Sequence, residues 1–234
     1  MTDLLGTSHK LQHGTEGYLA CVQYLLPASK RVCPWSTVQC RTACLGLHSG
    51  RMSADDSAVR RAQRWRTEFY FSDPASYFAR LGKELAGLAR RADRLGLVPC
   101  ARLDGTSDLG IAGQALDRGI VPDGLRLWDY SKSVDRALAQ VGSPVWDVTY
   151  SYHGNVDDSL AVLRAGGRVA VVYPSLDCVP IRQWRFRTVD GNATDLRFTD
   201  PPRTVCALPL KGVSNARKKR ALRRDPDGAF IVRA

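Results

Sequence analysis

The amino-acid sequence predicts an α/β protein built on a mostly parallel sheet of six strands. Short apolar runs alternate along the chain with stretches of helical periodicity. Several of these runs are apolar on both faces, as in residues 169–173, which is typical of strands that are covered on both sides. Strands that alternate with helices imply right-handed crossovers. We expect a six-stranded partial (β/α) barrel, although periodicity alone equally allows an open, doubly wound sheet.

The strands are predicted from runs of apolar and β-branched residues that end at turn-forming residues. In chain order they span residues 19–26, 97–103, 125–128, 146–150, 168–173 and 204–208.

The helices between the strands are predicted from their capping signals. Asp73-Pro74 begins a helix whose apolar residues recur at helical spacing from Phe78 to Leu88. Asn155 caps a second helix that ends at Gly166, and Ser131 or Ser133 caps a short one through residue 138. Residues 53–71 have the pattern of a basic amphipathic helix.

Two segments depart from this alternation. Residues 181–198 contain Val189-Asp190-Gly191-Asn192 between two apolar and basic runs, which predicts a hairpin insertion. Residues 211–234 form a basic C-terminal arm, either solvated or a surface helix, whose Phe230-Ile231-Val232 can dock on the core. Nothing in between resembles a linker, so we expect a single α/β domain over residues 1–234.

The net charge of +11 and the pI of about 9.6 favour polyanionic partners. A nucleic acid is therefore one predicted partner, and the basic cluster Arg217, Lys218, Lys219 and Arg220 is its predicted contact. The alternative is a protein that is basic throughout because its sequence is rich in arginine. The N-terminus has no secretory pattern and no run reaches about 18 apolar residues, so we expect a cytoplasmic protein without a membrane partner.

Three cysteines follow the first predicted strand within the cysteine loop, residues 32–46. If Cys40 opens a helix, Cys44 lies one turn further on the same face, and Cys33 approaches from the loop. Thiolates favour an iron–sulfur cluster or zinc. We predict Cys33, Cys40 and Cys44 to be ligands of a [4Fe–4S] cluster. The alternatives are zinc, with His48 as fourth ligand, and buried thiols without a metal.

The chain has seven cysteines, an odd number, which argues against a disulfide framework. The other four lie in or beside apolar runs and are predicted to be core residues; they are Cys21, Cys100, Cys178 and Cys206.

Polar residues follow the second, third and fourth predicted strands. The carboxyl ends of parallel strands share one edge, where α/β proteins place their sites. We therefore expect a cofactor-binding face beside the cysteine loop, made by Arg102, Asp104, Thr106, Ser107, Asp108, Asp129, Lys132 and Ser151. The alternative for residues 104–107 is a turn that caps a helix.

Several motifs resemble a bacteriophage family named after gene product 88. They include Leu25-Leu26-Pro27-Ala28, Cys33-Pro34 through Cys44-Leu45, Gly50-Arg51, residues 102–108, residues 128–132, Val189-Asp190-Gly191, residues 195–198 and Leu210-Lys211-Gly212. The resemblance implies a phage protein that acts in the host cytoplasm, and it implies little about activity.

A wider resemblance is to radical S-adenosylmethionine enzymes. In those enzymes a three-cysteine loop after the first strand binds a [4Fe–4S] cluster within a six-stranded partial barrel, and S-adenosylmethionine is the cofactor. The spacing here is C-x6-C-x3-C rather than C-x3-C-x2-C, Ala43 precedes the last cysteine, and no glycine motif follows the second strand. The sequence therefore predicts a phage iron–sulfur protein, either radical-SAM-like or a relative that has lost catalysis. The alternative is a basic nucleic-acid-binding protein with structural zinc or no metal.

Overall fold

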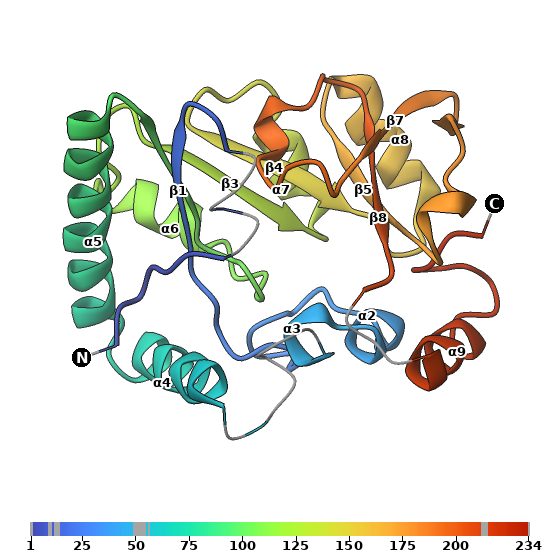
Figure 1. Ribbon diagram of the computed structural model, residues 1–234, viewed down its shortest axis with the longest axis horizontal. Coiled ribbons are helices and arrows are strands. Elements are labelled where there is room, and N and C mark those ends of the chain that lie inside the picture. Colours follow the sequence, from blue (N-terminus) through green and yellow to red (C-terminus); the bar gives the residue numbers. More distant parts are fainter. Residues whose placement is uncertain are drawn as a thin grey trace.

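The computed structural model describes residues 2–8, 11, 15–48, 55, 57–211 and 215–233, with backbone only for 215–218. Its centre is a sheet whose strands lie in the order β1-β2-β3-β4-β5-β8-β7-β6 (Figure 1). Every neighbouring pair is parallel except the antiparallel pair β6–β7. The described sheet is open, since β1 and β6 stand at its two edges.

The prediction of a mostly parallel α/β sheet is confirmed. The described sheet has eight strands rather than six, because the two strands of the hairpin insertion also belong to it. The six expected strands form within a few residues of their predicted bounds. They are β1 (Tyr18–Val22), β2 (Val98–Arg102), β3 (Arg126–Ser131), β4 (Trp146–Ser151), β5 (Val169–Tyr173) and β8 (Val205–Pro209), and the added pair is β6 (Arg182–Gln183) and β7 (Phe186–Asp190).

The longer helices begin at the predicted caps. The side chain of Asp73 accepts a hydrogen bond from the Ser76 amide, and that of Asn155 accepts one from the Asp158 amide. The helices are α2 (Val38–Thr42), α3 (Leu45–His48), α4 (Ala58–Ser72), α5 (Pro74–Leu95), α6 (Ile111–Asp117), α7 (Val134–Ala139), α8 (Val156–Ala165) and α9 (Asn215–Arg223), with single 3-10 turns η2 (Leu176–Cys178) and η3 (Arg197–Thr199). None of the helices in the described ranges is both long and apolar enough to cross a bilayer.

Helices α5 to α8 pack on one face of the sheet and create the main core. Leu81 of α5, Ile111 of α6 and Leu163 of α8 belong to the same buried cluster as Leu127 of β3 and Val171 of β5. Because strands adjacent in sequence are also adjacent in space and their helices lie on one face, the sheet is wound in a single direction.

The opposite face of the sheet has its own, smaller core. Side chains alternate along a strand, so Trp128 points away from its neighbour Leu127 and into this second cluster. Residues 194–200 cover the cluster, with Leu196 and Phe198 inside it. Half-buried charge also lies on this face, because Arg102 pairs with Asp195 at 3.6 Å.

The hairpin insertion forms within the predicted range, but its turn was predicted in the wrong place. β6 and β7 are joined by Trp184 and Arg185 rather than by residues 189–192. Asp190 instead ends β7, which pairs in parallel with β8. The next residue, Gly191, is a glycine because an added Cβ would lie 2.8 Å from the Ala207 carbonyl oxygen of β8. The glycine signal therefore reflects a close approach to a neighbouring strand.

The C-terminal arm is a helix followed by a tail that docks on the sheet. Ile231 forms a parallel bridge with Val172 of β5, and the Val232 amide donates to the Val172 carbonyl at 2.8 Å. Phe230 and Ile231 are buried. The predicted docking of residues 230–232 is thus confirmed, while residues 212–214 of the arm lie outside the described ranges.

Candidate metal centre at the carboxyl edge of the sheet

The cysteine loop lies below the carboxyl ends of the strands, where Figure 1 shows α2 and α3. Thr37 caps α2, and its hydroxyl accepts a hydrogen bond from the Cys40 amide at 3.1 Å. The helix ends at Thr42, because Ala43 has already left the helical conformation. Cys44 therefore lies in the connection between α2 and α3, and it does not follow Cys40 on one helix face as the spacing predicted.

The loop that follows β2 holds the start of the cysteine loop. The Asp108 amide donates to the Val32 carbonyl at 2.8 Å. The Cys33 thiol lies 3.6 Å from the Thr106 carbonyl oxygen, and the Thr106 hydroxyl donates to the Leu25 carbonyl at 2.5 Å. Contacts between residues about 80 positions apart therefore fix Cys33 beside the end of β2.

Arg60 of α4 holds the other end of the loop. Its buried guanidinium donates to the Gly46 carbonyl at 3.2 Å and to the Leu47 carbonyl at 3.4 Å. These carbonyls belong to α3, directly after Cys44. Sequence reasoning assigned Arg60 to a solvated basic face, since an arginine in an amphipathic helix gives no sign that it is buried.

The three thiols influence one another through space. Burial, with smaller contributions from Cys44, Cys40 and Asp108, raises the pKa of Cys33 to about 12. Burial also raises the pKa of Cys44, with Cys40 acting in the same direction and Lys132 in the opposite one. The loop thus gathers the three thiols in a partly buried place, where Cys33 is protonated at neutral pH unless a cation or cluster draws the proton off.

A single-ion site is not formed. Among the described residues no three or more His, Cys, Asp or Glu side chains lie close enough to hold one metal ion. Tetrahedral zinc needs thiolates at about 2.3 Å from the same ion. The Cys₃His zinc alternative with His48 stays a prediction.

Asp104 is saturated by hydrogen bonds from its own loop. One carboxylate oxygen accepts from the Ser107 hydroxyl at 2.6 Å and from the Leu109 amide at 3.1 Å. The other accepts from the Ile111 amide at 2.9 Å, at the start of α6. This is the capping turn that the sequence left as the alternative, and both Asp104 and Ser107 are buried in it.

Asp108 is likewise engaged by protein partners. Its carboxylate accepts from the Ser131 hydroxyl at 2.7 Å, the Lys132 amide at 2.9 Å and the Arg136 guanidinium at 2.5 Å. Asp108 therefore joins the ends of β2 and β3. Sequence reasoning missed Arg136, whose place in the first turn of α7 gave no indication of an ion pair with the preceding crossover.

Asp129 retains an unused oxygen. One oxygen accepts from the Asp104 amide at 2.9 Å, and the other is buried without a hydrogen-bond partner among the described residues. Burial raises the pKa of Asp129 well above its ordinary value, the Asp104 charge adds to this, and Arg102 opposes it. Burial therefore favours the protonated form of Asp129.

Lys132 contacts the end of β4 and the C-terminal tail. Its ammonium group donates to the Ser151 hydroxyl at 3.1 Å and lies 5.6 Å from the centre of the Phe230 ring. It also lowers the pKa of Cys44. The charge of Lys132 thus acts on the Cys44 thiol. Within the described ranges Lys132 forms no ion pair, unlike Asp108, which pairs with Arg136.

Arg102 lies apart from this group. Its guanidinium is on the opposite face of the sheet, paired with Asp195 and placed 4.6 Å from the centre of the Tyr130 ring. Its position at the end of β2 predicted a site residue, but strand alternation directs it away from the cysteine loop.

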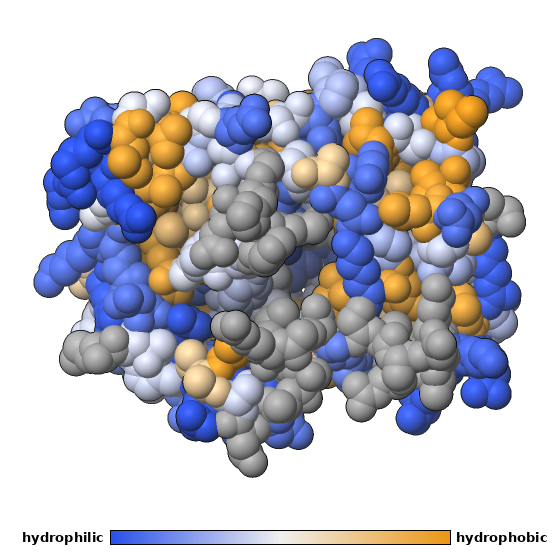
Figure 2. Space-filling model, viewed as in Figure 1, coloured by the Kyte–Doolittle hydropathy of each residue, from blue (hydrophilic) through white to orange (hydrophobic). Residues whose placement is uncertain are grey.

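The basic helix α9 lies beside the cysteine loop. Ala221 of α9, Phe230 and Ala43 share a small buried cluster into which Cys40 also packs. Of the predicted nucleic-acid contacts, Lys219 and Arg220 are exposed, whereas the side chains of Arg217 and Lys218 are outside the described part. Figure 2 shows hydrophilic side chains at the corner that α9 occupies in Figure 1.

Comparison with known proteins identifies the family. A search among proteins curated for function found no similar chain, and a search among solved structures found none either. The family model described as Gene product 88 matches residues 4–225, which include the cysteine loop, every strand and α9. That match spans nearly the whole sequence, so the chain belongs to the bacteriophage Gene product 88 family.

Proposed function

We propose that this phage protein binds a [4Fe–4S] cluster through Cys33, Cys40 and Cys44. The single observation that carries the proposal is the placement of the three-cysteine loop directly after β1, where contacts with the loop after β2 hold Cys33 at the carboxyl edge of the parallel sheet. All seven cysteines are free of disulfides, so these thiols are available to a metal. Thiolates are the ligands that iron–sulfur clusters use.

A cluster suits this arrangement better than a single ion. In a cluster each cysteine binds a different iron, so the sulfurs need not converge on one point. Among the described residues no three such side chains surround a single point. This argues more strongly against one zinc ion than against a cluster. When bound, the cluster supplies one-electron transfer.

The type of iron–sulfur protein that we propose follows the resemblance to radical S-adenosylmethionine enzymes. The cysteine loop after β1 and the sequential order of the parallel strands β1 to β5 agree with a radical-SAM-like partial barrel, whether active or degenerate, whereas the described sheet has eight strands and is open. Three cysteines leave one iron of a cubane without a protein ligand, and S-adenosylmethionine is the cofactor that the resemblance suggests there. Lys132 and Ser151 would face such a ligand, since the Lys132 ammonium group donates to the Ser151 hydroxyl and its charge acts on the Cys44 thiol.

Purification without oxygen tests the proposal. The protein should be brown, absorb near the wavelengths of sulfur-to-iron charge transfer, and contain iron and acid-labile sulfide in equal amounts. Zinc in place of iron, or a colourless protein that cannot be reconstituted with iron and sulfide, would refute it.

A second function is favoured by the exposed basic residues at the C-terminus. Lys219, Arg220, Arg223 and Arg224 are all exposed at the end of α9 and just after it. Together with the net charge of +11 they support binding to the phosphate backbone of a nucleic acid. A titration of labelled single-stranded and duplex oligonucleotides at increasing salt tests it, and no binding at low salt would exclude it.

A further inference from the structure

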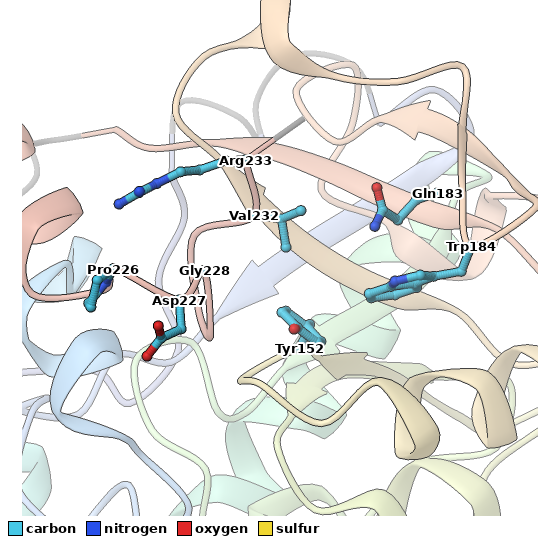
Figure 3. A pocket seen from close by; sticks show the side chains of 8 residues that line it. All are labelled: Tyr152, Gln183, Trp184, Pro226, Asp227, Gly228, Val232 and Arg233. Carbon is cyan, nitrogen blue, oxygen red and sulfur yellow. The ribbon is translucent and has the colours of Figure 1, made fainter.

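A cavity of about 290 Å³ lies at the carboxyl end of β4, between the β6–β7 hairpin and the C-terminal tail (Figure 3). It is separate from the cysteine loop, which contributes no residue to its wall. It is lined by Tyr152, Gln183, Trp184, Pro226, Asp227, Gly228, Val232 and Arg233.

The cavity exists because β4 and β5 separate at their carboxyl ends. The two strands pair only as far as Ser151 and Ala170. Beyond that point the tail takes the place of β4, with Ile231 bridged to Val172. Ligand sites of α/β proteins lie at this end of the sheet, and the volume is at the small end of the range for ligand pockets, which suits one planar ring system.

Two aromatic rings form one wall of the cavity. The ring centres of Tyr152 and Trp184 are 5.2 Å apart, and the ring planes are inclined by 55°. Figure 3 shows both rings on the same side of the opening, with Val232 near them. A flat apolar ligand entering here would stack on one ring and contact the edge of the other.

The hairpin presents Trp184 at a cost in backbone energy. Trp184 and Arg185 have φ angles of 50° and 71°. Positive φ at both positions of a two-residue hairpin is the type I′ turn, which favours Asn-Gly. A tryptophan held in this conformation stores strain of the kind that clusters at ligand sites. The turn places the indole in the cavity wall, beside Tyr152 and the tail residue Val232.

Polar groups around the rings suit a heteroaromatic ring. The Tyr173 hydroxyl donates to the Gln183 side-chain oxygen at 3.2 Å, which fixes the amide beside Trp184. Asp227 and Arg233 are exposed at the other side of the opening. One nitrogen of the Arg233 guanidinium already donates to the Leu222 and Asp225 carbonyls, at 2.7 and 3.0 Å. The Gln183 amide nitrogen can donate to the edge of a base, and the Asp227 carboxylate can accept from it.

Positive charge lies on the segments that form the cavity. Arg233 lines it, Arg182, Arg185 and Arg187 are exposed on the hairpin that carries Trp184, and Arg224 is exposed just before the tail. Aromatic rings on segments that also carry exposed cations are a combination that binds single-stranded nucleic acid, since the rings stack bases and the cations follow phosphates.

We propose that the cavity receives one unpaired base of a single-stranded nucleic acid, stacked on Trp184 and Tyr152. This inference rests on the second function proposed above and adds to it the form of the nucleic acid and the place of contact. A duplex cannot offer a base in this way unless it is opened.

Binding of a fluorescent single-stranded oligonucleotide to the full chain tests this. Trp184→Ala should weaken binding by roughly 5- to 150-fold, the range for loss of one base–aromatic stack, while Trp184→Phe should retain most of it. The matched control is Trp65→Ala, because Trp65 is a partly exposed tryptophan on the distant helix α4. The affinity of Trp65→Ala for the oligonucleotide should equal that of wild type.

A second variant guards against a folding defect. Trp184→Asn with Arg185→Gly supplies the preferred type I′ pair, so the hairpin should form at least as stably while binding still falls. The added Arg185→Gln variant separates the lost charge from the lost ring.

The outcomes are distinct. Equal binding by wild type and Trp184→Ala would show that the cavity does not bind a base. It would not contradict the proposal that α9 binds phosphates. No binding of any oligonucleotide at low salt would overturn both proposals. Equal affinity for a duplex, or full competition by a mononucleotide at equal concentration, would overturn the single strand as the occupant.

Discussion

The backbone amide of Asp108 donates a 2.8 Å hydrogen bond to the carbonyl of Val32, so the loop after β2 is fastened to the residue before Cys33. The Asp108 side chain simultaneously binds the end of β3 through Ser131 and the Lys132 amide. One residue therefore links the cysteine loop to two neighbouring strands. This arrangement makes the carboxyl edge of the sheet a rigid support for the three thiols.

Replacing Asp108 by Asn should destabilise the protein. The amide keeps the size of the side chain but removes the charge that Arg136 contacts at 2.5 Å, and one of its two terminal atoms no longer accepts. We expect a loss of about 1–3 kcal/mol in the free energy of unfolding, measured with urea. Asp117→Asn, at an exposed position, should cost little. Unchanged stability in Asp108→Asn would contradict the supporting role.

Asp129 should make the folded state less stable as pH rises. Its pKa is raised by burial in the folded protein, whereas the unfolded chain loses the proton at about pH 4. Between those values the folded state holds more protons, so the free energy of unfolding falls as pH increases. Asp129→Asn retains an acceptor for the Asp104 amide and removes the titration.

The expected result is therefore a stability curve for Asp129→Asn that declines less than wild type between about pH 4 and pH 7. Asp123→Asn, on an exposed loop, is the control. Thermal unfolding across this range measures the effect. Parallel curves for wild type and Asp129→Asn would show that Asp129 is ionised in the folded protein.

The basic helix α9 should govern the salt dependence of nucleic-acid binding. Replacing Arg217, Lys218, Lys219 and Arg220 by Gln should flatten the plot of log affinity against log salt, by about 0.7 per lost contact to a single strand and about 0.9 on a duplex. The comparison is Arg64→Gln on the exposed surface of α4. A slope that stays the same in the α9 variant would show that these residues do not contact phosphates.

The sequence predicted the parallel strands well because each is a buried run with a consistent pattern. Val169 to Tyr173 is apolar on both faces and is covered on both faces in the fold. The capping residues Asp73 and Asn155 also act as predicted, since a cap is a local interaction between residues three apart.

The features that sequence reasoning missed depend on contacts between distant segments. The turn at Trp184-Arg185 carries residues that disfavour it, so no local signal indicated it. Gly191 is required by the approach of β8 and not by a turn. The burial of Arg60 and the insertion of Ile231 beside β5 likewise depend on partners far along the chain.

The candidate site was predicted in outline. The cysteine loop does follow β1, and the polar residues Asp104, Asp108, Asp129 and Lys132 do gather at the same edge of the sheet. Their hydrogen bonds, however, occupy Asp104 and Asp108 within the fold. A direct role of these carboxylates in holding a cofactor stays a prediction, and Lys132 is better placed for one.

Iron and acid-labile sulfide per chain, measured after anaerobic reconstitution, test the central claim most directly. Wild type and Cys178→Ser should load equally, because Cys178 lies in η2, outside the cysteine loop, and contacts the Ser175 hydroxyl at 3.3 Å. Cys33→Ser, Cys40→Ser and Cys44→Ser should each lose most of the cluster, since an alkoxide is a poor substitute for a thiolate. Equal iron and sulfide in all five proteins, or none in wild type, would contradict the assignment of these three cysteines.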